Sequence, residues 1–163
     1  MTWPAKKASD RPDMSVATRL VGSAVGAAAG LAATAAMTGV LAVAAARGWL
    51  GRPPPEKIVE HAAPDLSASD RKPVTVVSHF AFGAGAGAFY GLLGGWRAKS
   101  RLMSGLQGVG FGLTVWAVSY EGWVPALKIM PPAHRDRPAR SATMVVAHII
   151  YGAVLGLLMR RGK

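Results

Sequence analysis

The stretch SHFAFGAGAGAFYGLLGG, residues 78–95, contains one histidine, six glycines and no Asp, Glu, Lys or Arg. Gly83, Gly87, Gly91 and Gly95 recur every four residues, so they share one face if the stretch is helical. A row of glycines lets two helix backbones approach closely, which drives helix association in lipid. The stretch therefore predicts a membrane-spanning helix that packs on another helix through its glycines.

Uncharged runs of 19 residues or more occur four times in the 163-residue chain. About 20 apolar residues carry a helix across the roughly 30 Å hydrocarbon layer of a membrane. The predicted fold class is therefore all-α, an integral membrane four-helix bundle with spans at about 20–46, 74–96, 102–122 and 141–159. Two alternatives are less consistent with these runs. A soluble Ala/Gly-rich helical domain has little room for four of them, and the first is longer than the 7–15 apolar residues typical of a signal peptide.

The spans divide the chain into a basic cytoplasmic tail, residues 1–19, and one transmembrane domain, residues 20–160. Loops 47–73 and 123–140 then lie on the opposite side from the termini. The terminal side carries ten Lys and Arg residues in short segments near helix ends and the loop side carries nine, which favours cytoplasmic termini. We expect a multi-pass membrane protein.

The net charge of +11 has two possible meanings, a nucleic-acid partner or contact with anionic lipid headgroups. Lys and Arg lie at predicted helix ends and in loops, and they form no run with interleaved aromatic residues. The predicted partner is therefore the lipid bilayer, with no nucleic acid. Cysteine is absent, which excludes disulfides, Cys-ligated metal sites and thiol catalysis.

A shorter version of the opening stretch, AHIIYGAVLG, occupies residues 147–156. His79-x-x-Phe82-Gly83 aligns with His148-x-x-Tyr151-Gly152, and Gly30 of the first span aligns more weakly with Gly110 of the third. These matches predict an internal repeat of two related helical hairpins. The predicted glycine-zipper residues are Gly22, Gly26, Gly30, Gly83, Gly87, Gly91, Gly95, Gly152 and Gly156, and a surplus row could serve a homo-oligomer or a larger membrane complex.

Titratable side chains converge on one level of the predicted bundle and form a polar intramembrane layer. They are His79, His148, Tyr120 and Glu121. The layer has three open interpretations: helix packing, a proton or solute path in a small channel or transporter, or a haem or metal site with His79 and His148 as ligands. No set of catalytic residues can be extracted, so we expect a non-enzymatic structural or accessory protein with no resident cofactor.

The segment PPPEKIVEHAAPDL, residues 53–66, predicts a short amphipathic helix in the first loop. Prolines suit the start of such a helix, and Ile58 and Val59 lie opposite Glu56 and Glu60. We expect it to rest on the membrane surface.

Three segments, SHFAFGAGAGAFYG, VWAVSYEGWVPALKIMPPAHRDRP and AHIIYGAVLGLL, resemble small bacterial inner-membrane proteins of the YagU type, a family of unknown function. The resemblance covers roughly residues 74–160 and depends on the aromatic–glycine runs, the Pro-Pro loop and the late histidine. It implies a location in a bacterial inner (cytoplasmic) membrane and supplies no catalytic residue.

Overall fold

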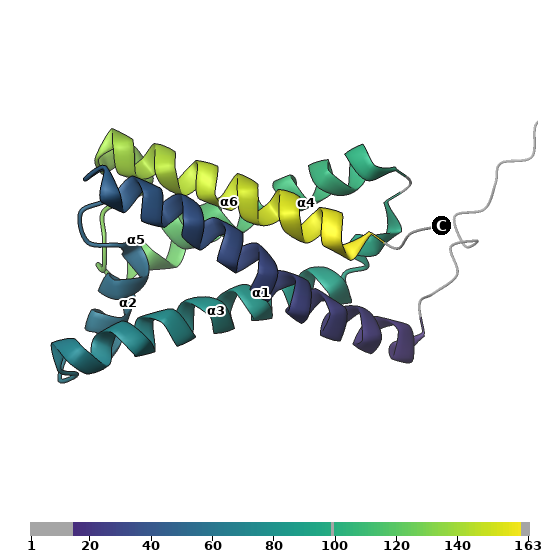
Figure 1. The fold of residues 1–163 in the computed structure, drawn as a ribbon, viewed down its shortest axis with the longest axis horizontal. Helices are drawn as coiled ribbons and strands as arrows, with labels where there is room; N and C mark the ends of the chain where they lie inside the picture. Colours follow the sequence, from purple (N-terminus) through teal and green to yellow (C-terminus); the bar gives the residue numbers. More distant parts are fainter. Residues whose placement is uncertain (1–14, 99, 161–163) are drawn as a thin grey trace, which may run out of the picture.

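The computed structural model describes residues 15–98 and 100–160, and every regular element in that part of the chain is a helix. Four long helices run alternately in opposite directions (Figure 1): α1 (Val16–Ala46), α3 (Ala68–Leu92), α4 (Arg101–Trp116) and α6 (Pro138–Met159). The start of α1 and the end of α6 lie at the same end of the molecule. Most of the predicted basic tail, residues 1–14, falls outside the described residues.

The connections carry short elements: α2 (Pro54–Ala62), η1 (Gly95–Arg97), η2 (Ala117–Trp123), α5 (Val124–Ala126) and η3 (Ala133–Arg135). α4 continues through η2 into α5 as one helical segment of 26 residues. η2 is π-helical, and Gly122 has the non-helical backbone angles φ −102° and ψ −106°. π-helical turns and glycines are common causes of helix kinks.

Serine side chains fix the first turns of three long helices. Ser15, Ser67 and Ser100 each accept a hydrogen bond from a backbone N–H three residues later, at the starts of α1, α3 and α4. Such a cap satisfies one of the N–H groups that a helix start leaves without an intrahelical partner. α6 instead begins at Pro138, where the missing N–H of proline has no cost.

Three helices are long and apolar enough to cross a membrane: Val16–Ala46, Arg101–Ala126 and Pro138–Met159. α3 is not among them, so the predicted four-helix membrane bundle is not confirmed. The physical reason is composition, because the first turns of α3 carry Asp70, Arg71 and Lys72 and its remainder contains serine, histidine and glycine.

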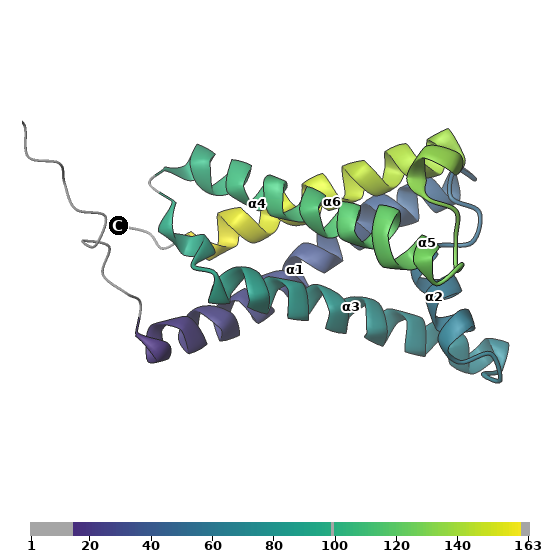
Figure 2. The ribbon, with the colours of Figure 1, turned by 180° about the vertical axis from the view of Figure 1, so that it is seen from behind.

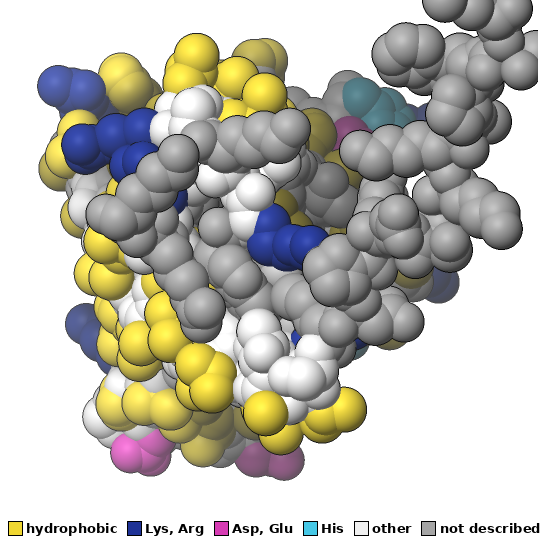
Figure 3. Space-filling model, turned by 90° about the vertical axis from the view of Figure 1, so that its right-hand side faces the viewer, with side chains coloured by type: hydrophobic (Ala, Val, Ile, Leu, Met, Phe, Trp, Pro, Cys, Tyr) yellow, Lys and Arg dark blue, Asp and Glu magenta, His cyan; other side chains and the backbone are white. Residues whose placement is uncertain are grey.

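Seen from the end where α1 begins, hydrophobic side chains cover much of the visible flank, with Lys and Arg on the end face (Figure 3).

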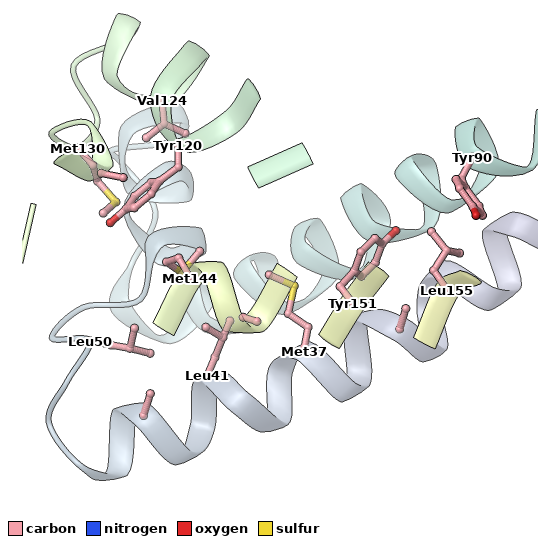
Figure 4. Packing of buried hydrophobic residues seen from close by; sticks show 14 of the residues in the cluster. Met37, Leu41, Leu50, Tyr90, Tyr120, Val124, Met130, Met144, Tyr151 and Leu155 are labelled. Atoms are coloured by element: carbon pink, nitrogen blue, oxygen red, sulfur yellow. The ribbon is translucent and has the colours of Figure 1, made fainter. Parts of the chain in front are cut away.

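The long helices form two antiparallel pairs, α1 with α3 and α4 with α6, and α1 crosses α6 where the pairs meet (Figure 2). The core between the pairs contains Met37 and Leu41 of α1 together with Met144, Tyr151 and Leu155 of α6 (Figure 4). Tyr120 and Val124 extend this core toward the loop end. α1 and α6 are therefore the two inner helices: α1 contacts α3 and α6, and α6 contacts α1 and α4.

Candidate functional site

The first pair is held by close backbone contact along one row of glycines in each helix, which we call the first seam. It consists of Gly22, Gly26 and Gly30 of α1 and Gly83, Gly87 and Gly91 of α3. A Cβ atom at Gly87 would overlap the carbonyl oxygen of Gly26 and lie 2.8 Å from the Cα atom of Gly30. A Cβ atom at Gly91 would overlap the carbonyl oxygen of Gly22. The neighbours are backbone atoms, which cannot rotate away.

At the end of this seam a threonine takes the place of a glycine. Thr34 donates a hydrogen bond from its hydroxyl to the carbonyl oxygen of Gly30 at 2.7 Å, and this hydroxyl fills the space where Gly83 would carry a Cβ atom. Thr34 is 1% exposed. A hydroxyl satisfied within its own helix can therefore be buried against the neighbouring backbone without an unpaired polar group.

The second pair has an equivalent seam, made of Ser104, Gly108 and Gly112 of α4 and Gly152 and Gly156 of α6. A Cβ atom at Gly108 would overlap the carbonyl oxygen of Gly152, and one at Gly156 would lie 3.0 Å from the Cα atom of Gly108. The Ser104 hydroxyl donates to the carbonyl oxygen of Gly156 at 2.5 Å.

Two glycines singled out in the sequence lie outside these seams. A Cβ atom at Gly95 would meet the ring of Tyr90, five residues earlier in the same chain segment, instead of a facing helix. A Cβ atom at Gly110 would have no atom of a facing helix within 4 Å. Gly108 takes the place that the sequence alignment gave to Gly110, because Gly108 meets Gly152 as Gly30 meets Gly83.

A largely apolar cavity of about 250 Å³ lies between the two pairs. Its walls come from α3 and from α4 with η2, α1 and α6 form its floor, and α2 closes one side with Ile58 and Val59. Phe82 lines the cavity while 52% of its surface is exposed, so the cavity opens to the outside beside this ring. The amphipathic helix predicted in the first loop thus turns apolar residues toward the cavity.

Both predicted intramembrane histidines line this cavity. Nδ1 of His148 lies 2.7 Å from the carbonyl oxygen of Met144. A carbonyl oxygen can only accept, so Nδ1 carries the proton and Nε2 is left for another partner. Nε2 of His79 is buried and has no hydrogen-bond partner among the described residues.

Tyr151, which the predicted repeat aligns with Phe82, joins the two pairs across the cavity floor. Its hydroxyl donates to the carbonyl oxygen of Gly83 at 2.7 Å. This bond between α6 and α3 was not predicted from the sequence. In the predicted repeat, Tyr151 carries a hydroxyl where the aligned Phe82 has none.

Three of the four residues of the predicted polar layer line the cavity, and Glu121 does not. Tyr120 is 3% exposed and lines the cavity with the two histidines. Glu121 lies outside it, because its carboxylate accepts from the backbone N–H of His134 at 3.2 Å and lies 3.0 Å from Nδ1 of that ring. Consecutive residues of a helix point in different directions around its axis, so Tyr120 and Glu121 do not share a face.

A buried polar cluster at the loop end of the bundle, which we call the brace, consists of Arg140, Asp136, Tyr120 and the backbone of Leu50. Arg140 is 6% exposed, and its Nη1 atom lies 3.0 Å and 3.1 Å from the two carboxylate oxygens of Asp136. Its Nε–H donates to the carbonyl oxygen of Leu50 at 2.8 Å, and the hydroxyl of Tyr120 donates to Asp136 at 2.5 Å. The brace therefore connects the first loop, η2 and α6.

Burial alone would raise the pKa of the Asp136 carboxyl, but hydrogen bonds from Tyr120, from the backbone N–H of Arg137 and from Arg140 together hold that pKa below its usual value. Asp136 and Arg140 were missed as site residues in the sequence analysis. Their spacing of four residues at the start of a helix is the signal that could have found them.

The described part of the chain contains no group of three or more His, Cys, Asp or Glu side chains that could hold a metal ion. A site with two histidines and one carboxylate would need Glu121 in the cavity, where it does not lie. The nitrogens available to a haem or metal in the cavity are then those of His79 and His148.

A family model described as Family of unknown function (DUF6789) matches residues 20–163. No curated protein and no solved structure matches the chain. These comparisons give no specific support to the YagU-type resemblance. The matched residues include both seams, the cavity and the brace, and they make up most of the chain, which therefore belongs to the DUF6789 family, a family of unknown function.

Proposed function

We propose that this protein is a non-enzymatic membrane protein that binds an apolar, membrane-resident ligand in the cavity between its two helix pairs. The observation that carries the proposal is Nε2 of His79, a buried atom with no hydrogen-bond partner among the described residues, on a side chain that lines a largely apolar cavity. Leaving such a group unpaired costs about 1–3 kcal/mol. An aliphatic ligand with one hydroxyl or carbonyl group would fill the cavity and satisfy this nitrogen.

The arrangement of the helices supports entry of the ligand from the lipid. α3 packs mainly on α1 and α2, whereas α4 packs mainly on α6. The rings of Tyr90 and Phe111, with centroids 4.9 Å apart, join α3 to α4. The cavity lies between α3 and α4, and it is open beside the half-exposed ring of Phe82. In a membrane this opening would face hydrocarbon chains.

The proposal includes α3 as a fourth membrane helix, in a bacterial inner membrane with cytoplasmic termini. The first seam holds α3 at the depth of α1, and the outer face of α3 is apolar, with Val77 67% exposed and Phe89 54% exposed. Its charged residues are confined to the first turns.

Cysteine labelling tests this placement, because the chain has no cysteine of its own. In intact spheroplasts a membrane-impermeant maleimide should label Lys72→Cys, at the loop end of α3. It should label Arg97→Cys only after lysis, and Val77→Cys in neither condition. Rapid labelling of Val77→Cys would contradict a membrane position for α3, and labelling of Arg97→Cys before lysis would contradict the orientation.

Ligand binding can be tested with a long-chain alcohol that carries a photoreactive diazirine and an alkyne handle. Ala86 lines the cavity, and Ala81 lies on the exposed face of the same helix. Ala86→Phe should reduce photolabelling of the purified protein at least tenfold, whereas Ala81→Phe should leave it unchanged. His79→Leu should remove the preference for the alcohol over the matching alkane probe, because Nε2 is the atom that recognises the hydroxyl.

Two results would refute the binding proposal. One is equal labelling of the wild type and Ala86→Phe, with circular dichroism showing both folded. The other is labelling whose cross-linked peptides map to the outer face of α3 instead of to the cavity walls.

A further inference from the structure

A second hollow, of about 750 Å³, lies at the loop end of the molecule and differs from the cavity in its polar lining. Five cationic side chains and one carboxylate line it: Arg52, Lys57, Lys128, Arg137, Arg140 and Glu60. Glu60 is engaged by Arg52 at 2.5 Å and by Arg71 at 3.3 Å. The other four cations lining the hollow are Lys57, Lys128, Arg137 and Arg140, so its lining carries more positive than negative charge.

Arg140 lines the hollow with a side chain that hydrogen bonds hold in one orientation. Its hydrogen bonds within the described residues use Nε and Nη1, which hold the guanidinium plane against Leu50 and Asp136. Nη2 points toward Gly51, where a Cβ atom would lie 3.2 Å from it. This arrangement leaves Nη2 as the remaining donor of a buried side chain that lines the hollow, since Arg140 is 6% exposed.

A second guanidinium group converges on the same point. Nη1 of Arg137 would lie 3.5 Å from a Cβ atom at Gly51. Two guanidinium groups side by side repel each other, and Asp136 already serves as the partner of Arg140. An anion seated between them would remove the repulsion and accept hydrogen bonds from both.

Two backbone positions around the hollow adopt left-handed angles, Gly51 with φ +62° and Lys128 with φ +58°. Glycine adopts this conformation without strain, but a lysine there is uncommon. The turn at Lys128 brings a further cation to the rim.

We propose that this hollow binds a phosphate group, supplied either by the headgroup of an anionic lipid or by free phosphate. Arginine forks match phosphate oxygens in bidentate geometry, and basic pockets next to membrane helices suit anionic headgroups. The site is independent of the apolar cavity, so the two proposals can fail separately.

The test compares phosphatidic acid, diacylglycerol and inorganic phosphate as ligands of the full-length protein in detergent, by native mass spectrometry and thermal shift. Phosphatidic acid and diacylglycerol differ in the phosphate group. The double variant Lys128→Gln/Arg137→Gln removes two cations from the hollow and leaves the brace intact. The control Lys72→Gln/Arg135→Gln removes two exposed cations of the same end that do not line it.

The hollow variant should bind phosphatidic acid about 30-fold more weakly than the wild type, from the usual contribution of two cations near a membrane surface. The control should stay within about threefold of the wild type. Displacement of the lipid by inorganic phosphate would identify free phosphate as a ligand, and its failure to displace would identify the headgroup; both support a phosphate site. Equal weakening in the two double variants, no weakening in either, or equal binding of phosphatidic acid and diacylglycerol would overturn it.

Discussion

Substitution of Gly87 by alanine tests whether backbone contact holds α1 and α3 together. The added Cβ atom would overlap the Gly26 carbonyl oxygen and lie 2.8 Å from Cα and 3.0 Å from N of Gly30. Overpacking of this kind costs about 1–3 kcal/mol. Alanine also gains about 1 kcal/mol over glycine in a helix interior, so the measured loss is smaller than the steric cost.

Gly85 separates the two contributions. It lies two residues away in α3, and a Cβ atom there would have nothing within 4 Å. Gly85→Ala should therefore show the helix-propensity gain alone, and the difference between the two variants should be the steric cost of about 1–3 kcal/mol.

The measurement is reversible unfolding in mixed micelles with increasing sodium dodecyl sulfate, followed by helical circular dichroism. We expect Gly85→Ala to be as stable as the wild type or more stable, and Gly87→Ala to be less stable than both. Equal free energies of unfolding for the two alanine variants would refute the seam.

Three further predictions concern other contacts. In the second pair, Gly108→Ala should destabilise the protein by about 1–3 kcal/mol relative to Gly110→Ala, measured in the same micelles. Tyr151→Phe should cost about 1 kcal/mol in the same assay, because the buried carbonyl oxygen of Gly83 loses its donor; an unchanged midpoint would argue against that bond. For Asp136, the pKa is lower in the folded state than in the unfolded state, so the carboxylate contributes stability above the unfolded pKa of about 3.9 and loses it as the pH falls through the folded pKa. Asp136→Asn should lower the stability at pH 6 by about 3 kcal/mol and flatten its decline between pH 5 and pH 3; a decline as steep as that of the wild type would assign the acid sensitivity to other groups.

The helical architecture could be predicted from the spacing of charged residues, because uncharged runs of about 20 residues are typical of membrane-spanning helices. The membrane boundary of α3 could not be predicted in the same way. Pro73–Trp96 contains no charge, but the helix begins earlier, at Ala68, and includes three charged residues in its first turns. Its glycines and serine lower its hydropathy further, so a run without charge is not the same as an apolar helix.

The polar contacts were harder to predict, because they depend on rotation about a helix axis and on loops. Tyr120 and Glu121 are adjacent in sequence, yet one lines the cavity and the other pairs with His134 in the following loop. The bond from Arg140 to the carbonyl oxygen of Leu50 joins residues 90 positions apart. No local pattern indicates such a contact, since any carbonyl oxygen can accept.

The two kinds of interface in this molecule differ in how they can respond to a ligand. In both seams glycine backbone atoms lie against backbone atoms, so a shift along or across the seam produces a collision that no side chain can relieve. Between the pairs, Met37 of α1 and Met144 of α6 both line the cavity and belong to the core. Methionine has three rotatable bonds and fills irregular spaces. We therefore expect a ligand that enlarges the cavity to move the two pairs as rigid units, with the change absorbed by these methionines where α1 crosses α6.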